Sequence, residues 1–189
     1  MKRLQNDATA KTTLKYLGIK HLEIGTSHPS WKMRSKTRIA VKKSIIKARI
    51  ITGTLVLQKN RHRFNTFDIS SICPMCRLED EDVIHFLLKC SLLAGSRQEH
   101  FRLLKNEVIN NSEDGTWLKT FNNDERITTL IIDCRNYSET FMENTSVMDR
   151  IEELSIELCY LYMLDVYNVR RKHEVNKSGM FRNVINCAI

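Results

Sequence analysis

Apolar residues recur at three- and four-residue spacing along most of this chain, a pattern typical of helices with one buried face. The longest such pattern runs over 145–172 and predicts a long C-terminal amphipathic helix. Its apolar positions are Val147, Ile151, Leu154, Leu158, Leu161, Tyr162 and Val169. Shorter patterns predict helices over 35–52, 97–108 and 124–135, whereas 55–64 fits either a strand or a helix. The expected fold class is therefore mainly α.

The predicted helix over 35–52 carries two kinds of side chain. Its apolar stripe consists of Ile39, Ile45, Ile46, Ala48, Ile50 and Ile51. Its basic residues, Arg38, Lys42, Lys43, Lys47 and Arg49, lie on the other sides of the helix. Gly53 favours a helix end directly after this pattern. We therefore expect the stripe to face the core and the basic side chains to face solvent.

A run of polar residues and Gly115 over 110–115 predicts a loop, and it is the best internal boundary of the chain. It separates a basic helical region, 1–110, from a C-terminal helical extension, 111–189. Six glycines and two prolines in 189 residues favour helices over turn-rich β architecture.

The composition, with 42% hydrophobic and 28% charged residues, is ordinary for a soluble globular protein. No apolar run approaches the roughly 18 residues that a membrane-spanning helix needs. The first seven residues turn polar at once, so no secretory leader is expected. We expect an intracellular protein whose thiols stay reduced, in either the nucleus or the cytoplasm.

Charge is unevenly distributed along the chain. Residues 1–65 contain sixteen Lys and Arg against two acidic residues, a net +14, whereas residues 66–189 carry a net −6. A half-chain this basic attracts polyanions, and nucleic acid is the commonest one inside cells. The alternative is a solvated basic surface without a ligand. The candidate phosphate-binding residues are Lys42, Lys43, Lys47, Arg49, Lys59, Arg61 and Arg63.

Four residues within 73–90 have the order and spacing of metal ligands. Cys73 and Cys76 flank a Pro-containing turn, His85 follows after eight residues, and Cys90 follows after four more. Three thiolates and one imidazole form a closed tetrahedral site of the CCHC zinc-knuckle type, and these soft ligands select Zn²⁺. A single structural ion is expected, since 73–90 has few apolar side chains and structural zinc contributes about 10–16 kcal/mol in small peptides.

The spacing also predicts local geometry. The apolar run 83–88 predicts a short helix that carries His85, and Cys90 lies five residues later. The chain must therefore leave α geometry for the Cys90 sulfur to reach the site. The acidic stretch 79–82 reads as a solvated loop, and Arg77 and Lys89 are placed to offset the negative charge of the metal site.

Other interpretations of these cysteines fit less well. A redox Cys-x-x-Cys pair is expected between a strand and a helix of a βαβ unit, and no such pattern surrounds Cys73. Unrelated buried cysteines would need neither the turn nor the histidine. Cys134, Cys159 and Cys187 have no other ligand at suitable spacing and read as ordinary thiols.

The order of segments resembles the C-terminal zinc-binding region of reverse transcriptases from non-LTR (LINE-type) retrotransposons. The matching segments are 14–17, 28–31, 47–54, 57–61, 64–65, 73–76, 81–86 and Cys90, with Arg97 at the place of an Arg that usually follows the last ligand. The likeness is strongest over 45–97. It implies a helical, zinc-stabilised, nucleic-acid-binding module, a detached tail of a longer polyprotein.

The residues of polymerase and nuclease chemistry are missing from this sequence. There is no Tyr/Phe-x-Asp-Asp run, and no acidic cluster suits a two-metal nuclease. We therefore expect no enzymatic activity. The leading hypothesis is binding of RNA or single-stranded DNA. Phe64 or Trp31 is able to stack on a base, although we expect both side chains to be buried. The alternative is a protein-interaction or dimerisation module that uses 145–172 and a purely structural zinc.

Overall fold

The computed structural model describes residues 14–18, 28 and 37–175, with the side chains of the last helix described as far as Tyr160 and at Met163 and Leu164. Trp31 and Cys187 lie outside these ranges. The elements in chain order are α2 (Arg38–Ile51), α3 (Gln58–Phe64), a π-helical turn η4 (His85–Lys89), a 3-10 turn η5 (Ser91–Leu93), α4 (Ala94–Asn110), α5 (Thr116–Thr120), α6 (Asp124–Ile132), the 3-10 turns η6 (Cys134–Tyr137) and η7 (Glu139–Phe141), and α7 (Thr145–Val175).

The described part of the chain is helical, as the apolar spacing predicted. Its β structure is limited to one antiparallel bridge between Ile72 and Asp80. The ambiguous segment 55–64 forms α3, preceded by the buried Leu55 and Leu57. None of the described helices combines the length and the apolar composition that a membrane-spanning segment needs.

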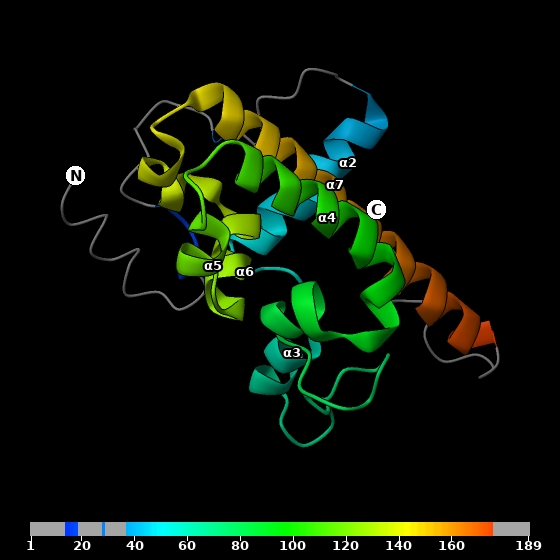
Figure 1. Cartoon of the computed structure of the whole chain (residues 1–189). Helices are drawn as coiled ribbons and strands as arrows, with labels where there is room; N and C mark the ends of the chain where they lie inside the picture. The colour runs from blue at the N-terminus through cyan, green and yellow to red at the C-terminus, as the bar shows by residue number, and fades with distance from the viewer. Residues whose placement is uncertain (1–13, 19–27, 29–36, 176–189) are drawn as a thin grey trace, which may run out of the picture.

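The core lies where α7 packs against α4 on one side and α2 on the other (Figure 1). Helices α4 and α7 run side by side in opposite directions. Their fully buried side chains include Leu104, Val108, Ile151 and Leu158. Helix α4 precedes the 110–115 loop in sequence and α7 follows it, yet the two helices share one hydrophobic core. The loop therefore connects two helices of the same core.

Helix α2 buries part of its predicted apolar stripe together with two polar side chains. Its buried residues are Ser44, Lys47, Ile50 and Ile51, and Ile46 is half-buried against the core. Ile39 is 57% exposed and Ile45 is 39% exposed, so the expectation was wrong for these two positions. The physical reason is that the Lys47 ammonium finds acceptors inside the fold.

Those acceptors come from α6 and α7. The Lys47 Nζ atom donates to the Ile131 carbonyl and to Ser155 Oγ at 2.5 Å, and it lies 3.4 Å from Glu152 Oε1. Glu152 is itself buried at 3% exposure. A buried charge is tolerated when it is paired and hydrogen-bonded, so this contact sets the orientation of α2 on α7.

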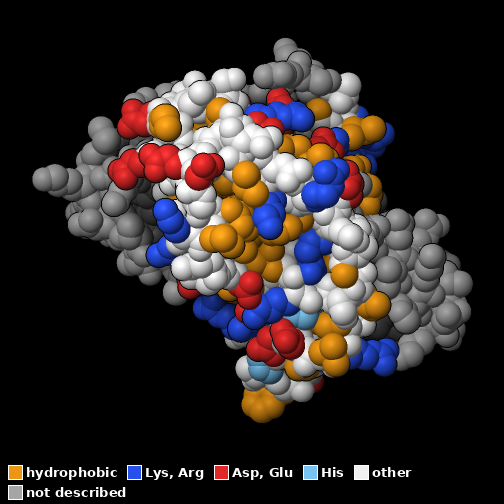
Figure 2. Space-filling model, in the orientation of Figure 1, with side chains coloured by type: hydrophobic (Ala, Val, Ile, Leu, Met, Phe, Trp, Pro, Cys, Tyr) orange, Lys and Arg blue, Asp and Glu red, His pale blue; other side chains and the backbone are white. Residues whose placement is uncertain are grey.

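An aromatic row joins α4 to α5 and η6, and it explains the short helix α5, which the apolar spacing did not predict. The ring centroids of Phe101 and Trp117 are 5.9 Å apart, those of Trp117 and Phe121 5.4 Å, and those of Phe121 and Tyr137 4.9 Å. Figure 2 shows hydrophobic side chains gathered between α4 and the helices α5 and α6 on this face. The row therefore closes this side of the core.

The described N-terminal turn, 14–18, is attached to the chain after α6. Gly18 donates its N–H to Asp133 Oδ2 at 2.8 Å, and Asn136 Nδ2 donates to the Tyr16 carbonyl at 2.9 Å. A β-carbon at Gly18 would lie 3.0 Å from Asp133 Oδ2, closer than an ordinary van der Waals contact, so glycine permits this approach without a shift of Asp133. The buried Asp133 thus joins segments 115 residues apart in sequence.

Candidate metal centre

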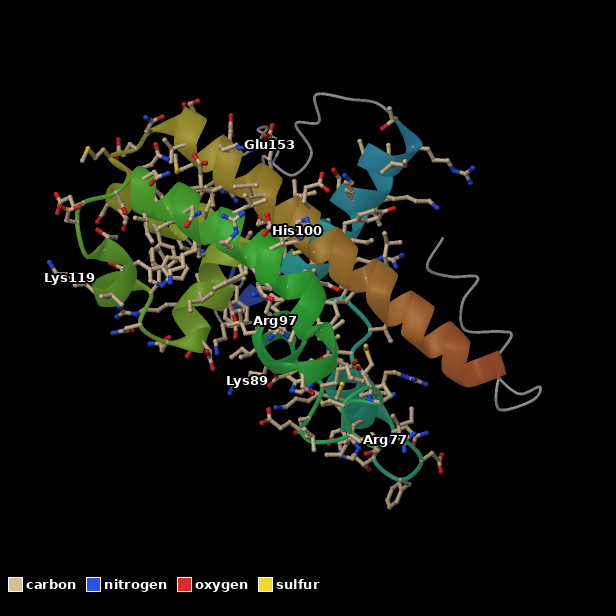
Figure 3. All side chains as sticks on the ribbon, turned by 45° about the vertical axis from the view of Figure 1, so that its right-hand side comes forward. Arg77, Lys89, Arg97, His100, Lys119 and Glu153 are labelled. Atoms are coloured by element: carbon tan, nitrogen blue, oxygen red, sulfur yellow. The ribbon has the colours of Figure 1, made fainter. Side chains whose placement is uncertain are left out.

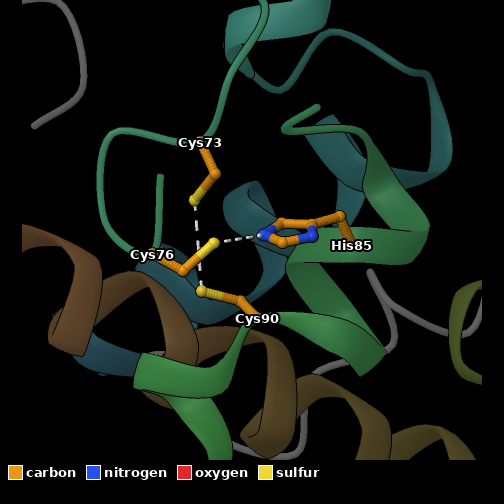
Figure 4. Close-up of side chains that lie close together, drawn as sticks. All are labelled: Cys73, Cys76, His85 and Cys90. Atoms are coloured by element: carbon orange, nitrogen blue, oxygen red, sulfur yellow. Dashed lines mark hydrogen bonds between the residues drawn. The ribbon is translucent and has the colours of Figure 1, made fainter. Parts of the chain in front are cut away.

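Four side chains with soft or imidazole donors converge beside α3 and η4 (Figure 4). The candidate ligand atoms of Cys73, Cys76, His85 and Cys90 all lie within 4.8 Å of one another. Cys76 Sγ is 3.3 Å from His85 Nε2, and Cys73 Sγ is 4.0 Å from Cys90 Sγ. Ligands on a tetrahedron with metal–sulfur bonds of about 2.3 Å lie about 3.7 Å apart. The cluster therefore has the dimensions of a site that could hold a metal ion.

The first two ligands sit on a tight turn. Arg77 donates its N–H to the Cys73 carbonyl at 2.9 Å, and Cys73 donates to the Glu79 carbonyl at 2.8 Å. Arg77 adopts a left-handed conformation with φ of 59°, which reverses the chain immediately after Cys76. The turn points both sulfurs into the same space.

The last two ligands are placed by the π-helical turn η4. Asp82 accepts the His85 N–H with Oδ1 at 2.9 Å and the Phe86 N–H with its carbonyl at 2.9 Å, which starts the turn. Cys90 then donates its N–H to the His85 carbonyl at 2.8 Å, five residues back. An i to i+5 bond defines a π-turn. The predicted departure from α geometry between His85 and Cys90 is confirmed.

Arg97 of α4 holds the carbonyls around the last ligand. Its Nη2 atom donates to the Cys90 carbonyl at 2.8 Å, and its Nη1 atom donates to the Leu88 carbonyl. Figure 3 shows Arg97 on α4 beside the η4 turn. A planar guanidinium can bind two acceptors at once, so Arg97 connects the Cys90 backbone to the helical core.

Glu79 contacts the ring nitrogen of His85 that faces away from the thiols. Its Oε2 atom lies 3.3 Å from His85 Nδ1, while Nε2 faces Cys76. A carboxylate on one ring nitrogen keeps the proton there and leaves the other nitrogen as the ligand. The sequence signal for this role was its position three residues after Cys76, within the stretch that we read as a solvated loop.

The thiols differ in proton affinity. Burial raises the pKa of the Cys73 thiol to about 12 and also raises the pKa of Cys90. Burial acts in the same direction on Cys76, but hydrogen bonds from the Leu78 backbone N–H, the Cys73 thiol, the Glu79 backbone N–H and the Cys90 thiol together outweigh it and lower the pKa of Cys76. A buried thiol with a raised pKa keeps its proton at neutral pH. A bound metal cation would displace that proton and stabilise the thiolate.

The acidic stretch 79–82 is only partly solvated, which corrects its interpretation as a solvated loop. Glu81 is 1% exposed, and its Oε2 atom accepts the Gln58 N–H at 2.8 Å. The Glu81 carbonyl accepts the Lys59 N–H at 3.3 Å, and Lys59 Nζ lies 3.1 Å from Asp82 Oδ2 and 3.7 Å from Asp80 Oδ2. The candidate metal loop is thus hydrogen-bonded to the first turn of α3.

The basic side chains that we expected near the metal site have different surroundings. Lys89 Nζ lies 3.4 Å from Asp124 Oδ2, so it links η4 to α6. Arg77 is exposed at the turn after Cys76. Offsetting of the site's negative charge by these two residues stays a prediction.

The seven candidate phosphate-binding residues do not share one environment. Lys47 is fully buried, so its assignment to a phosphate-binding surface was wrong. Lys42 and Arg49 are half-buried on α2, and Lys43 pairs with Glu157 and lies over the Tyr160 ring. On α3, Lys59 and Arg63 are exposed and Arg61 is half-buried. The accessible candidates therefore form an α2 group and an α3 group.

The remaining described cysteines lie apart from the candidate ligand set. Cys134 and Cys159 are buried in the helical core, and burial raises the pKa of the Cys159 thiol to about 11. No second group of possible metal ligands lies among the described residues. Comparison of the chain with models of protein families, with curated proteins and with solved structures finds no match in any of the three.

Proposed function

We propose that this chain is a zinc-stabilised module that binds RNA or single-stranded DNA and has no catalytic activity of its own. The ion would be a single structural Zn²⁺ held by Cys73, Cys76, His85 and Cys90. Three sulfur donors and one imidazole favour zinc over hard cations such as Mg²⁺ or Ca²⁺. Four protein ligands leave no position for a reactive water, which argues against hydrolysis.

The observation that carries the nucleic-acid proposal is the attachment of α3 to the candidate metal loop. Glu81 accepts the backbone N–H of Gln58, and Lys59 lies between the carboxylates of Asp80 and Asp82. Metal binding would order the loop, and the loop would then hold α3 in place. Arg61 and Arg63 follow on the same short helix and would contact phosphates.

The charge of this region and the family resemblance support the same proposal. From Gln58 to Phe67 the sequence contains Lys59, Arg61 and Arg63 and no acidic residue. The retrotransposon resemblance, strongest over 45–97, includes α3, the four ligands and Arg97. We therefore propose that the chain derives from the tail of a LINE-type reverse transcriptase and acts inside the cell, where the thiols stay reduced.

The test is the salt dependence of binding by the zinc-loaded chain to a labelled twelve-nucleotide oligo-U or oligo-dT strand. Each phosphate contact contributes about −0.7 to the slope of log K against log salt for single strands. The double variant R61Q/R63Q should therefore flatten the slope by about 1.4. The matched control is R102Q/R150Q, which removes the same charge from exposed positions on α4 and α7. A flat wild-type dependence, or equal flattening in both variants, would contradict the proposal.

The alternative proposal is self-association through 145–172. The first half of α7 has little free surface for such an interface, because its apolar face packs against the core of the same chain. Leu158 is fully buried and Leu154 is half-buried in the contact of α7 with the rest of the core. A charge at Leu158 would therefore unfold the chain rather than separate two copies. An interface on α7 would have to use other positions, and sedimentation of the zinc-loaded chain would detect it.

A further inference from the structure

We propose that the turn after α3 is a base-stacking platform, in which Phe64 and Phe67 each stack on a base of a single strand whose phosphates contact Arg61 and Arg63. The inference rests on the proposed function. It adds that the protein contacts the flat faces of unpaired bases as well as the phosphates. We define the platform as residues 64–68 with the arginines at 61 and 63.

The first observation is the exposure of the two rings. Phe64 is 91% exposed and Phe67 is 98% exposed, more than any other large hydrophobic side chain described. The other described phenylalanines are buried or half-buried in the core, namely Phe86, Phe101, Phe121 and Phe141. Among the six described phenylalanines, four are therefore buried or half-buried, and the two exposed ones lie three residues apart at one turn. In Figure 2 hydrophobic side chains protrude at the lower tip of the molecule, where Figure 1 shows the turn after α3.

The second observation is that the turn is held by its own hydrogen bonds. Asn65 Nδ2 donates to Asp68 Oδ2 at 2.9 Å, and Asn65 Oδ1 accepts the Asp68 N–H at 3.3 Å. His62 Nδ1 lies 2.5 Å from the Ile69 carbonyl, which ties the end of the turn back to α3. The rings are thus presented on an ordered backbone, so binding has little chain entropy to remove.

The third observation is the charge beside the rings. Arg63 immediately precedes Phe64 and is exposed. Arg61 lies one helical turn before Phe64, and its Nη1 atom donates to the neutral Gln58 Oε1 at 3.3 Å. The first acidic residue after this stretch in sequence is Asp68, whose Oδ2 atom accepts from Asn65 Nδ2 at 2.9 Å. Cations interleaved with exposed aromatic rings are the arrangement that proteins use to bind single strands without strict sequence preference.

The same features favour a single strand over other ligands of an exposed apolar turn. A duplex keeps the faces of its bases stacked inside, so it has no free face for a ring. A lipid surface is broad, and its recognition by charge uses clusters of about four to eight Lys and Arg, more than the three basic residues of α3. A strand is narrow enough to follow Arg61 and Arg63 past the rings.

The experiment compares F64A, F67A and F64A/F67A with the wild-type chain, all zinc-loaded, at one salt concentration. The ligand is oligo-U containing 2-aminopurine, whose fluorescence falls when the base stacks. Each single variant should weaken binding about fivefold or more, because a stacked base contributes at least about 1 kcal/mol. The double variant should lose the fluorescence change and keep the salt slope, since no phosphate contact is removed. F64Y/F67Y should retain both affinity and the fluorescence change.

The matched control is L118A, which removes an equally hydrophobic side chain that is 78% exposed on α5. It should bind as the wild type does. Unchanged affinity and fluorescence in F64A/F67A, alongside a steep salt slope that R61Q/R63Q flattens, would overturn the platform while leaving the proposed function standing. Loss of binding to phosphatidylserine vesicles or to a protein in F64A/F67A, with unchanged oligo-U binding, would overturn it in favour of that ligand.

Discussion

The backbone N–H of Cys90 donates to the carbonyl of His85, five residues earlier, at 2.8 Å. This π-turn places two of the four candidate ligands on one element and aims both at the turn that carries Cys73 and Cys76. In an α-helix residue 90 would lie about 140° round the axis from residue 85, because five residues turn the chain by about 500°. The π-turn instead brings the Cys90 N–H back to the His85 carbonyl. The ligand geometry therefore depends on one irregular turn, which a bound ion would hold in place.

We expect the purified chain to carry one zinc ion and C90S to carry none. Cys90 is buried at 1% exposure, so a serine hydroxyl there replaces a soft charged ligand without opening the site to other donors. Native mass spectrometry with and without a chelator counts the ions. Chelation or C90S should also lower the melting temperature strongly, because structural zinc contributes folding free energy directly.

The control for this prediction is C159A, which removes a thiol from the α7 core rather than from the ligand set. It should keep one ion per chain at a modest cost in stability. A chain that is metal-free, equally stable with chelator and unchanged by C90S would contradict the zinc assignment.

Arg97 should control metal affinity through the backbone of Cys90. R97K loses the paired donation to the Leu88 and Cys90 carbonyls, because an ammonium cannot bind both in the plane of a guanidinium. Loss of such an outer contact typically weakens metal binding about 10- to 100-fold. Competition with a fluorescent zinc chelator measures the affinity. R102K, on the exposed side of the same helix, should leave it unchanged, and equal effects of the two variants would refute the role of Arg97.

Lys47 should determine stability and not nucleic-acid binding. K47M leaves the carboxylate of Glu152 buried without the lysine charge, and breaking a buried pair in this way costs about 3–5 kcal/mol. Denaturant unfolding measures the loss. The double variant K47M/E152L removes both charges and should recover much of it. If folded K47M bound oligo-U with a flatter salt slope, Lys47 would be a phosphate contact after all.

The variant E81A should change nucleic-acid affinity in opposite directions, depending on whether the charge of Glu81 or its hydrogen bond to α3 matters more. E81A removes a negative charge and would by electrostatics alone strengthen binding to nucleic acid. We expect weaker binding instead, because the α3 N-terminus loses the carboxylate that accepts the Gln58 N–H. The measurement is oligo-U affinity of the zinc-loaded variant. D114A, in the exposed loop before α5, makes the same charge change and should bind as tightly as the wild type or slightly more tightly. Stronger binding in E81A would argue that α3 needs no such anchor.

Asp133 should make the free energy of unfolding depend on pH in the acidic range. Burial alone would raise the pKa of its carboxyl, but the hydrogen bonds from Arg135 and the Gly18 N–H, with His28 Nε2 at 3.7 Å, together lower it well below the ordinary range. Because the folded pKa lies below the unfolded one, the ionised carboxylate stabilises the fold at neutral pH. This contribution is lost as the pH falls below about 4, the unfolded aspartate value.

D133N should therefore be less stable than the wild type at pH 7, by about 2 kcal/mol or more, since it breaks a buried pair with Arg135. The difference in stability between the two chains should begin to shrink as the pH falls below about 4, and it should disappear only below the lowered folded pKa. Denaturant unfolding from pH 7 downwards is the measurement, and D114N, at an exposed position, is the control. A constant difference between D133N and the wild type at all pH values would rule out the ionised carboxylate as the cause.

The order and spacing of residues determined the parts of this protein that are local in sequence. The four candidate ligands lie within 73–90, and both the turn and the departure from α geometry follow from the number of residues between them. The helical character follows in the same way from apolar spacing. Such features need only neighbouring residues, so a pattern of residue types is enough to predict them.

Only the tertiary structure decided which polar groups are buried and which apolar ones are exposed. Lys47 is buried because Ile131, Glu152 and Ser155 supply acceptors from 84 to 108 residues away. Glu81 is buried because α3 presents an N–H to it, and Phe64 and Phe67 are exposed because the turn after α3 projects from the core. The hydropathy of a side chain indicates only its intrinsic preference for water or for the core. The hydrogen-bond and ion-pair partners that change this preference come from distant segments, which meet only in the folded chain.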